Sequence, residues 1–265
     1  MSNRGKVLGK IRALLDQAES TDYESEADAF IAKAEQLMAK YDIEEALVAA
    51  AGKPTTDTIG RRRFYTDAGR YMGPRMQLFA GVAEAHGMTD RVQSRTYRYG
   101  KRQAVLEVWG YESDLEYLAM LVTSLLLQAG EAIHHPETVA KMRSECFNGG
   151  QTVAWKNAFM LGFAYRVANR VRVARRDAEA AAQREATEAH VDEATPASSS
   201  VALALIDRKK AVGAAFKTHY PKLYAGTRST AGSGGGSGYS RGDSAGGRAS
   251  LGGKKVRGSR GVLTA

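Results

Sequence analysis

Two amphipathic segments within the first fifty residues constrain the fold more than any other part of the chain. The first apolar stripe comprises Val7, Leu8, Ile11, Leu14, Leu15 and Ala18, and the second comprises Ala27, Phe30, Ile31, Ala34, Leu37, Met38 and Tyr41. Residues spaced by three and four positions share one face of a helix. Because the connection between the stripes is short, we expect an antiparallel helical hairpin over residues 6–47 with its apolar faces together.

Helix-start signals divide this segment further. The run Thr21-Asp22-Tyr23-Glu24 matches a capping box, in which the threonine hydroxyl and the glutamate satisfy amides at the start of the second helix. Asp42, with Glu45 three positions later, is predicted to cap an additional short helix.

Three phrases in the hairpin carry a resemblance to a known family. They are KIRALLDQAEST at residues 10–21, EADA at residues 26–29 and AKAEQLMAKY at residues 32–41. Together they resemble the DUF2786 domain, and the region around Phe159 and Phe163 resembles the companion part of such proteins. The resemblance implies an actinobacterial or bacteriophage protein. It implies no settled activity and no catalytic residues, so no site residue is transferred from the family.

The rest of the chain alternates strand and helix patterns. Strands are predicted at residues 58–66, 89–99 and 103–109, and the last two are expected to form a hairpin around Gly100. Helices are predicted from Pro74 to Gly87, over residues 112–129, over residues 137–187 with a weak point at Gly149-Gly150, and from a Ser200 cap to about residue 215.

The region after Pro221 differs in composition. Residues 226–253 are rich in glycine and serine, so we expect a flexible tail there. A short docked helix over residues 243–249 is the alternative, because small residues allow close approach.

These patterns predict an α+β fold with a helical hairpin, a small antiparallel sheet of about three strands flanked by helices, long C-terminal helices and a disordered basic Gly/Ser-rich tail. The expected domain organisation is residues 1–50 for the hairpin, 57–190 for the α+β domain, 199–222 for an additional helix and 223–265 for the tail.

Charge is unevenly distributed along the chain, whose formal net charge is +9. Residues 1–50 carry 6 Lys and Arg against 10 Asp and Glu, whereas residues 51–110 carry 11 against 5 and residues 201–265 carry 12 against 2. Such asymmetry is typical of proteins whose partner bears phosphates.

The leading candidate site is basic and aromatic. On the strands it comprises Arg61, Arg62, Arg63, Arg91, Arg95, Tyr97, Arg98, Tyr99, Lys101 and Arg102, and on the long helix Arg166, Arg170, Arg172, Arg175 and Arg176. Guanidinium groups bind phosphates and aromatic rings stack on bases. The same residues are also compatible with a solvated sheet face and a solvated helix end, and the β-strand register that would join Arg61–Arg63 to the hairpin is not readable from sequence.

The sequence contains few signals of enzymatic chemistry. The candidate metal ligands His86, His134, His135, Cys146, His190 and His219 lack zinc-type spacing. There is no Walker A loop and no Gly-x-Ser-x-Gly elbow. We therefore expect no metal and no cofactor.

Localisation signals favour a bacterial or phage-infected cytoplasm. Cys146 is the single cysteine, which excludes an internal disulfide and suits a reducing compartment. The first residues lead into an amphipathic helix rather than an apolar signal core. The most apolar window, residues 115–129, is too short for a membrane span, so no membrane is expected.

Three functions remain open at this point. The first is a non-enzymatic accessory protein that binds the nucleic-acid backbone through the basic strands and tail. The second is a protein-interaction module that recruits a partner through residues 6–47. The third is an uncharacterised hydrolase or nuclease, which a pocket gathering His86, Glu112 or His134 with a second polar group would favour.

Overall fold

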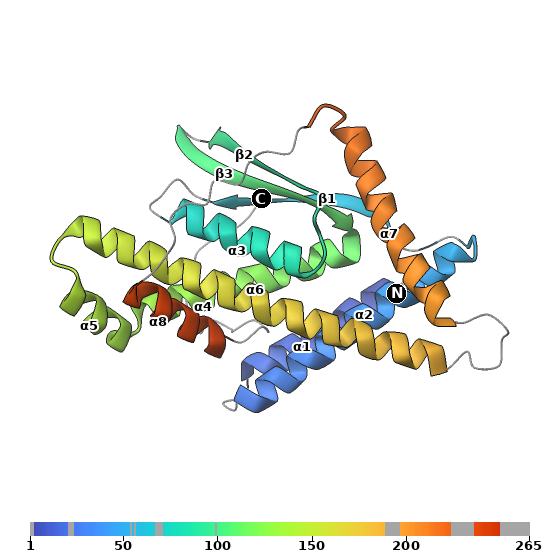
Figure 1. Ribbon diagram of the computed structural model, residues 1–265, viewed down its shortest axis with the longest axis horizontal. Coiled ribbons are helices and arrows are strands. Elements are labelled where there is room, and N and C mark those ends of the chain that lie inside the picture. The colour runs from blue at the N-terminus through green and yellow to red at the C-terminus, as the bar shows by residue number, and fades with distance from the viewer. Residues whose placement is uncertain are drawn as a thin grey trace.

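The computed structural model describes residues 3–20, 24–53, 55, 57–66, 71–98, 100–188, 197–223 and 236–249. The elements, in chain order, are α1 (Asn3–Ser20), α2 (Glu24–Ala50), β1 (Ile59–Thr66), α3 (Met72–Ala85), β2 (Arg91–Arg98), β3 (Lys101–Tyr111), α4 (Glu112–His134), α5 (Pro136–Glu145), α6 (Gly149–Glu188), α7 (Ala197–His219) and α8 (Ser237–Arg248). The fold is α+β, as predicted, with a small sheet above a layer of helices (Figure 1).

The sheet has three antiparallel strands in the order β1-β3-β2, so β3 is the central strand. Its inner face carries Leu106 and Val108, which are almost completely buried against the helices. The three predicted strands are confirmed to within a few residues. Gly100 adopts a φ of 72° in the β2–β3 turn, which a residue with a Cβ rarely adopts.

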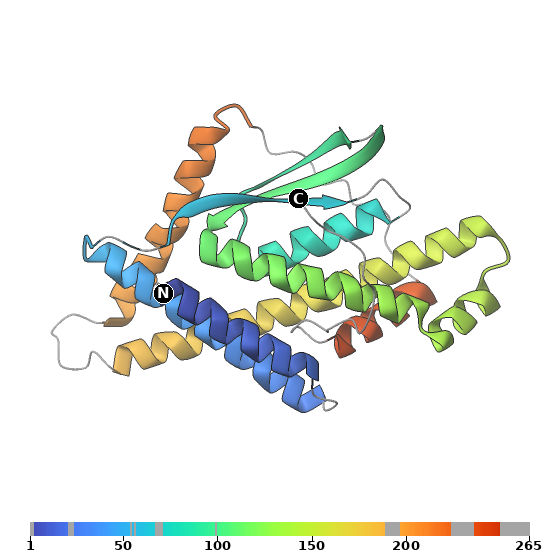
Figure 2. The same ribbon diagram turned by 180° about the vertical axis from the view of Figure 1, so that it is seen from behind.

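Helices α3, α4 and α6 pack beneath the sheet and supply most of the core. Phe159, Phe163 and Val167 on α6 repeat every four residues and are buried. With 40 residues, α6 is ~60 Å long and reaches past both ends of the sheet (Figures 1 and 2). It is the element on which the N-terminal and C-terminal helices both dock.

Helix α4 continues beyond the predicted end at residue 129. Gly130 lies inside the helix, and the break falls at His135, before Pro136 begins α5. Among the described residues, α4 is the one helix long and apolar enough to cross a membrane, and half of its most apolar window is buried within the protein. Core helices of soluble proteins show the same combination.

The N-terminal hairpin packs into the body of the protein. Ile11, Ala34 and Met38 are fully buried in the same core as the sheet and α6. The predicted cap at Asp42 is wrong, because α2 runs without interruption to Ala50 and the Asp42 side chain turns inward to an ion pair. The first three residues of the predicted capping box, 21–23, lie outside the described residues.

The remaining helix boundaries differ modestly from prediction. The break before α6 falls at residues 146–148, and Gly149-Gly150 belong to the first turn of the helix. Helix α7 begins at Ala197 and ends at His219, so Ser200 is an interior residue rather than a cap. Figure 2 shows α7 leaning from the far end of α6 up to the sheet.

Part of the predicted flexible tail is a docked helix. Residues 237–248 form α8, which packs along α6 through the glycines Gly238, Gly242 and Gly246. A Cβ at Gly242 would overlap the Phe159 carbonyl oxygen, and one at Gly162 would overlap that of Tyr239. Glycine on both helices thus allows backbone-to-backbone contact, whereas residues 224–235 and 250–265 lie outside the described part of the chain.

Because isolated glycine-rich helices are unstable in water, α8 depends on this contact. We expect Gly242→Val to release α8, lowering hydrogen-exchange protection of its amides by at least about tenfold while the sheet stays protected. Gly247→Ala is the matched control, since its Cβ would meet nothing closer than Arg166 Nε at 3.6 Å. That variant should retain or strengthen protection, and equal loss in both would contradict the docking model.

Candidate functional site

The strand register separates the predicted arginines onto two faces of the sheet. Arg62 and Arg91 both pair with Val108, so they share the inner face with the core. Arg61 pairs with Trp109 and Arg63 with Glu107, on the outer face. Strand β1 pairs with β3 and so lies alongside the hairpin. Arg61 and Arg63 nevertheless lie on the opposite face of the sheet from Arg91 and Arg95.

On the inner face, two of the arginines have intramolecular partners. Arg91 donates to Glu84 at 2.7 Å, and Arg62 donates to the Leu115 carbonyl at 3.1 Å. Arg95 and Tyr97 lie nearer the hairpin tip and are exposed, Tyr97 by 74%. Arg98, Lys101 and Arg102 belong to the strands, but their side chains, and all of Tyr99, lie outside the described part of the structure.

The predicted arginines of α6 also divide into two groups. Arg170 donates to the carbonyls of Gly246 and Ala249 and thereby caps the end of α8. Arg175 pairs with Asp42 and Glu179. The remaining members of the group are exposed: Arg166, Arg172 and Arg176, the last with Asp177 at 3.9 Å.

Glu107 organises the outer face of the sheet. Its buried carboxylate accepts hydrogen bonds from Arg63 Nε at 2.6 Å, Tyr220 Oη at 2.6 Å and Trp109 Nε1 at 3.0 Å. Burial raises the pKa of Glu107, but the hydrogen bonds from Tyr220, Arg63 and Trp109 outweigh it, so the pKa lies below its ordinary value. The carboxylate remains ionised and holds β1, β3 and the end of α7 together.

Aromatic rings from α7 surround Trp109 on this face. The ring centroids of His219, Phe216 and Tyr220 lie 5.0, 6.1 and 6.3 Å from that of Trp109. Arg61 lies 2.6 Å from the His219 ring nitrogen and 5.8 Å from the Trp109 centroid. The result is a surface of aromatic rings edged by guanidinium groups.

We call this surface the basic sheet face and define it by Arg61, Arg63, Tyr65, His219 and Tyr220, with Lys217 and Lys222 as further cations in the same segment of the chain. From Arg208 to Leu223 the chain carries five Lys and Arg residues and no Asp or Glu. Lys217 and Lys222 are exposed, and Tyr65 is 47% exposed. The sequence prediction missed the contribution of α7, although this acid-free run, with Phe216 and Tyr220 four residues apart, was the available signal.

A second cluster of charges lies buried where the hairpin, the sheet and α7 meet. Arg208 Nη2 lies 2.8 Å from Asp57, 3.4 Å from Asp42 and 3.9 Å from Asp114. The Arg208 guanidinium also lies 3.4 Å from the centroid of the Tyr111 ring. Asp57 additionally accepts hydrogen bonds from the backbone amide and hydroxyl of Ser113. We call Asp42, Asp57, Asp114, Arg175 and Arg208 the buried ion network.

The buried ion network holds three carboxylates and two guanidinium groups. Burial raises the pKa of Asp114 to about 7, with the neighbouring Asp42 adding to the effect and Arg175 and Arg208 opposing it. The Asp57 and Asp42 side chains are 0% and 4% exposed, and that of Asp114 is 20% exposed. The arrangement joins α2, α4, α6 and α7 to the segment before β1.

The histidines are dispersed. Burial, assisted by Arg175, lowers the pKa of His86 to about 3, and its ring packs edge-on against Tyr117. His134 contacts the Gly130 carbonyl within its own helix. No group of three or more His, Cys, Asp or Glu side chains suited to a metal ion occurs among the described residues. His190 lies outside them.

Comparison with known proteins identifies the hairpin alone. Residues 6–45 match the family described as a protein of unknown function, DUF2786. No curated protein and no solved structure matches the chain. The matched segment is α1 and most of α2, which supply Asp42 to the buried ion network.

Removing one member of a buried ion network leaves an uncompensated charge. We expect Arg208→Met to lower the free energy of unfolding by about 3 kcal/mol, measured by urea denaturation at pH 7. The neighbouring Lys209→Met is the control, because Lys209 is exposed and its removal should change stability by less than about 0.5 kcal/mol. Similar values for the two variants would contradict the proposed importance of the network.

The raised pKa of Asp114 makes stability depend on pH. Between the ordinary aspartate pKa and about 7, the folded protein binds a proton that the unfolded chain does not, so stability falls as pH rises through this range. We expect Asp114→Asn to reduce the loss of unfolding free energy between pH 5 and pH 8. Exposed Asp177→Asn should leave that loss unchanged, and an unaltered slope in both variants would refute the assignment.

Proposed function

We propose that this DUF2786 domain-containing protein binds the phosphate backbone of nucleic acid through the basic sheet face. The observation that carries the proposal is the pairing of two partly exposed guanidinium groups, Arg61 and Arg63, with rings supplied by α7. The side chains of Arg61 and Arg63 are 41% and 51% exposed, whereas Glu107 between them is 5% exposed. One buried carboxylate orients both cations and leaves their outer edges available to a ligand.

The charge balance of the face supports an anionic partner. Arg61 and Arg63 exceed the single charge of Glu107, and Lys217 and Lys222 add two further exposed cations. Arg–phosphate contacts are charge-assisted, and aromatic rings stack on bases without regard to sequence. Such a surface binds single strands or backbone with little sequence preference.

Exposed side chains elsewhere extend the possible contact area. The cation Arg95 and the aromatic residue Tyr97 lie on the β2–β3 hairpin, which projects from one end of the sheet in Figure 1. Neither Arg95 nor Arg172 has an ion-pair partner among the described residues. These positions provide secondary contacts, and the basic sheet face remains the principal site.

The hairpin-recruitment hypothesis receives less support. Its premise is a free apolar stripe, but Ile11 and Met38 are fully buried in the common core. Deleting residues 1–50 would not test this hypothesis cleanly, because it would also remove Asp42 from the buried ion network. The hydrolase hypothesis would be favoured by a pocket that gathers His86, Glu112 or His134 with a second polar group. The three are not brought together: the His86 ring packs on Tyr117, and Glu112 and His134 occupy opposite ends of α4, ~33 Å apart.

The test is fluorescence anisotropy of labelled single- and double-stranded DNA and RNA across a salt series. Backbone binding predicts a linear fall of log K with log salt concentration, with a slope that scales with the number of phosphate contacts. Lys217→Glu/Lys222→Glu should weaken binding by at least about tenfold and reduce the slope by about 1 to 2. Binding that does not change with salt would contradict the proposal.

A matched control separates the face from net charge. Lys53→Glu/Arg143→Glu changes the net charge equally but alters exposed residues just after α2 and on α5. This variant should retain most of the affinity, and equal losses would assign binding to overall charge. A chain ending at Ser250 keeps α8 and measures the contribution of the basic residues beyond it, whereas a chain ending at Tyr220 would expose the α6 surface that α8 covers.

A further inference from the structure

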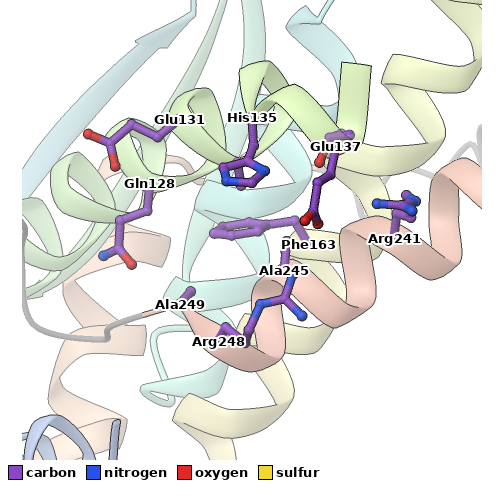
Figure 3. Close-up of a pocket in the computed structure, with 11 residues that line it drawn as sticks. Gln128, Glu131, His135, Glu137, Phe163, Arg241, Ala245, Arg248 and Ala249 are labelled. Carbon is purple, nitrogen blue, oxygen red and sulfur yellow. The ribbon is translucent and has the colours of Figure 1, made fainter. Parts of the chain in front are cut away.

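Apart from the basic sheet face, the described surface has a hollow and a free strand edge. The hollow, of about 410 Å³, lies between α8 and the junction of α4 and α5 (Figure 3). Its charged lining residues Glu131, Glu137 and Arg248 are exposed to solvent, so they do not require a ligand. The outer edge of β2 is different, because its free backbone groups match those of another peptide strand.

Strand β2 is an outer strand of the sheet, and its edge is regular (Figure 1). All 8 of its residues pair with β3, from Arg91 opposite Val108 to Arg98 opposite Lys101, without a bulge and without proline. Among the described elements, β3 is the only one that packs extensively on β2. Proteins usually blunt a free edge with a bulge, a proline or a covering element. An uninterrupted edge of this length therefore favours an added strand.

The hydrogen-bond pattern of the β2–β3 ladder decides which backbone groups face outward. The Trp109 amide donates to the Asp90 carbonyl at 2.9 Å, so the backbone groups of Asp90 point toward β3. In an antiparallel ladder every second residue points the same way, and the residues between them point away. The residues of β2 whose N–H and C=O groups point away from β3 are Arg91, Gln93, Arg95 and Tyr97. Each offers a donor and an acceptor, as a peptide partner requires, whereas phosphate groups offer acceptors only.

The side chains along this edge favour an acidic partner. From Arg91 to Arg102 the chain carries five Lys and Arg and no Asp or Glu. Arg91 is paired with Glu84, whereas Arg95 is exposed and has no ion-pair partner among the described residues. Tyr97, on the same face of the sheet, is 74% exposed. A strand added to this edge places side chains directly beside Arg95 and Tyr97, so an acidic residue two positions from an apolar residue fits them.

We propose that the β2 edge binds an extended acidic peptide segment of a partner protein, which adds a fourth strand to the sheet. The peptide backbone exchanges hydrogen bonds with β2, an acidic side chain pairs with Arg95, and an apolar side chain covers the Tyr97 ring. A second copy of this chain is a poor occupant, because its β2 edge carries the same charges. The proposal does not rest on nucleic-acid binding by Arg61 and Arg63, which lie on the opposite face.

The experiment is fluorescence anisotropy of the full chain with labelled peptides of about ten residues that alternate threonine and valine, with one or two valines replaced by glutamate. Matched peptides with lysine in place of glutamate should bind at least about tenfold more weakly. Methylation of alternate backbone nitrogens tests strand addition. One set of methylated positions should abolish binding and the other should preserve it, because only one edge of an added strand faces β2. No binding by any glutamate peptide, or equal effects of the two sets, would overturn the proposal.

Residue-resolved amide hydrogen exchange locates the bound peptide. The outward amides of Gln93 and Arg95 have no partner strand in the described sheet, so their exchange should slow at least about tenfold when a glutamate peptide binds. The amides of Ser94 and Thr96 already face β3 and should change less. Slowing confined to β1 or α7 would contradict the assignment.

Reversal of one charge tests the preference for acidic peptides. Arg95→Glu should weaken glutamate peptides by about tenfold and bind lysine peptides more tightly than glutamate peptides. Arg143→Glu alters an exposed arginine on α5 and should bind like the unmodified chain. An unchanged preference in Arg95→Glu would refute the pairing of this arginine with the peptide.

A proline variant separates the edge from nucleic-acid binding. Gln93→Pro removes an outward donor without removing a bond of the β2–β3 ladder, so it should abolish peptide binding and leave DNA and RNA binding unchanged. Urea unfolding checks that the variant is folded. Undiminished peptide binding by folded Gln93→Pro would overturn the proposal, as would a dimer of the unmodified chain that this substitution dissociates.

Discussion

The architecture depends on the contact of one arginine with three carboxylates, two of them buried and one partly buried. Arg208 on α7 reaches Asp57 before β1, Asp42 on α2 and Asp114 on α4, and Arg175 on α6 joins from the other side. Buried charges are costly unless they are paired, so each of these segments is held in one position relative to the others. A shift of α7 along its axis would leave at least one carboxylate without its guanidinium partner.

This constraint also positions the functional surface. The same helix that supplies Arg208 to the buried ion network supplies Phe216, His219 and Tyr220 to the outer face of the sheet. Three turns of α7 therefore connect the interior of the protein to the basic sheet face. The DUF2786 hairpin contributes Asp42 to the network, which links the matched domain to a surface formed entirely by later parts of the chain.

Local patterns in the sequence were sufficient to predict most helices and strands. They did not reveal which residues distant in the sequence form ion pairs in the fold. Alternation and turn residues predicted the three strands, and apolar spacing predicted the hairpin. By contrast, Arg175 and Asp42 are 133 residues apart, and Arg208 and Asp57 are 151 residues apart, so nothing nearby marks these arginines as buried. The β1–β3 pairing likewise decided that Arg62 turns inward while Arg61 and Arg63 turn outward.

Helix α8 illustrates a different limit of sequence reading. Its composition is that of a flexible linker, since glycine disfavours an isolated helix. The helix forms because Gly162 and the three contact glycines of α8 let two backbones approach within a distance that side chains would prevent. Helix propensity describes the α8 segment in isolation. The observed helix depends on the complementary surface of α6, about eighty residues earlier in the chain.

The three-stranded sheet has a further consequence for the behaviour of the protein in concentrated solution. As β3 is central, β2 presents one long edge whose backbone donors and acceptors are not used by another strand of the described sheet. Such an edge is a template for unwanted pairing between molecules. Exposed Arg95 places a positive charge along it, and two copies approaching edge to edge would bring like charges together. This side chain therefore helps to keep the protein dispersed, whatever ligand it contacts.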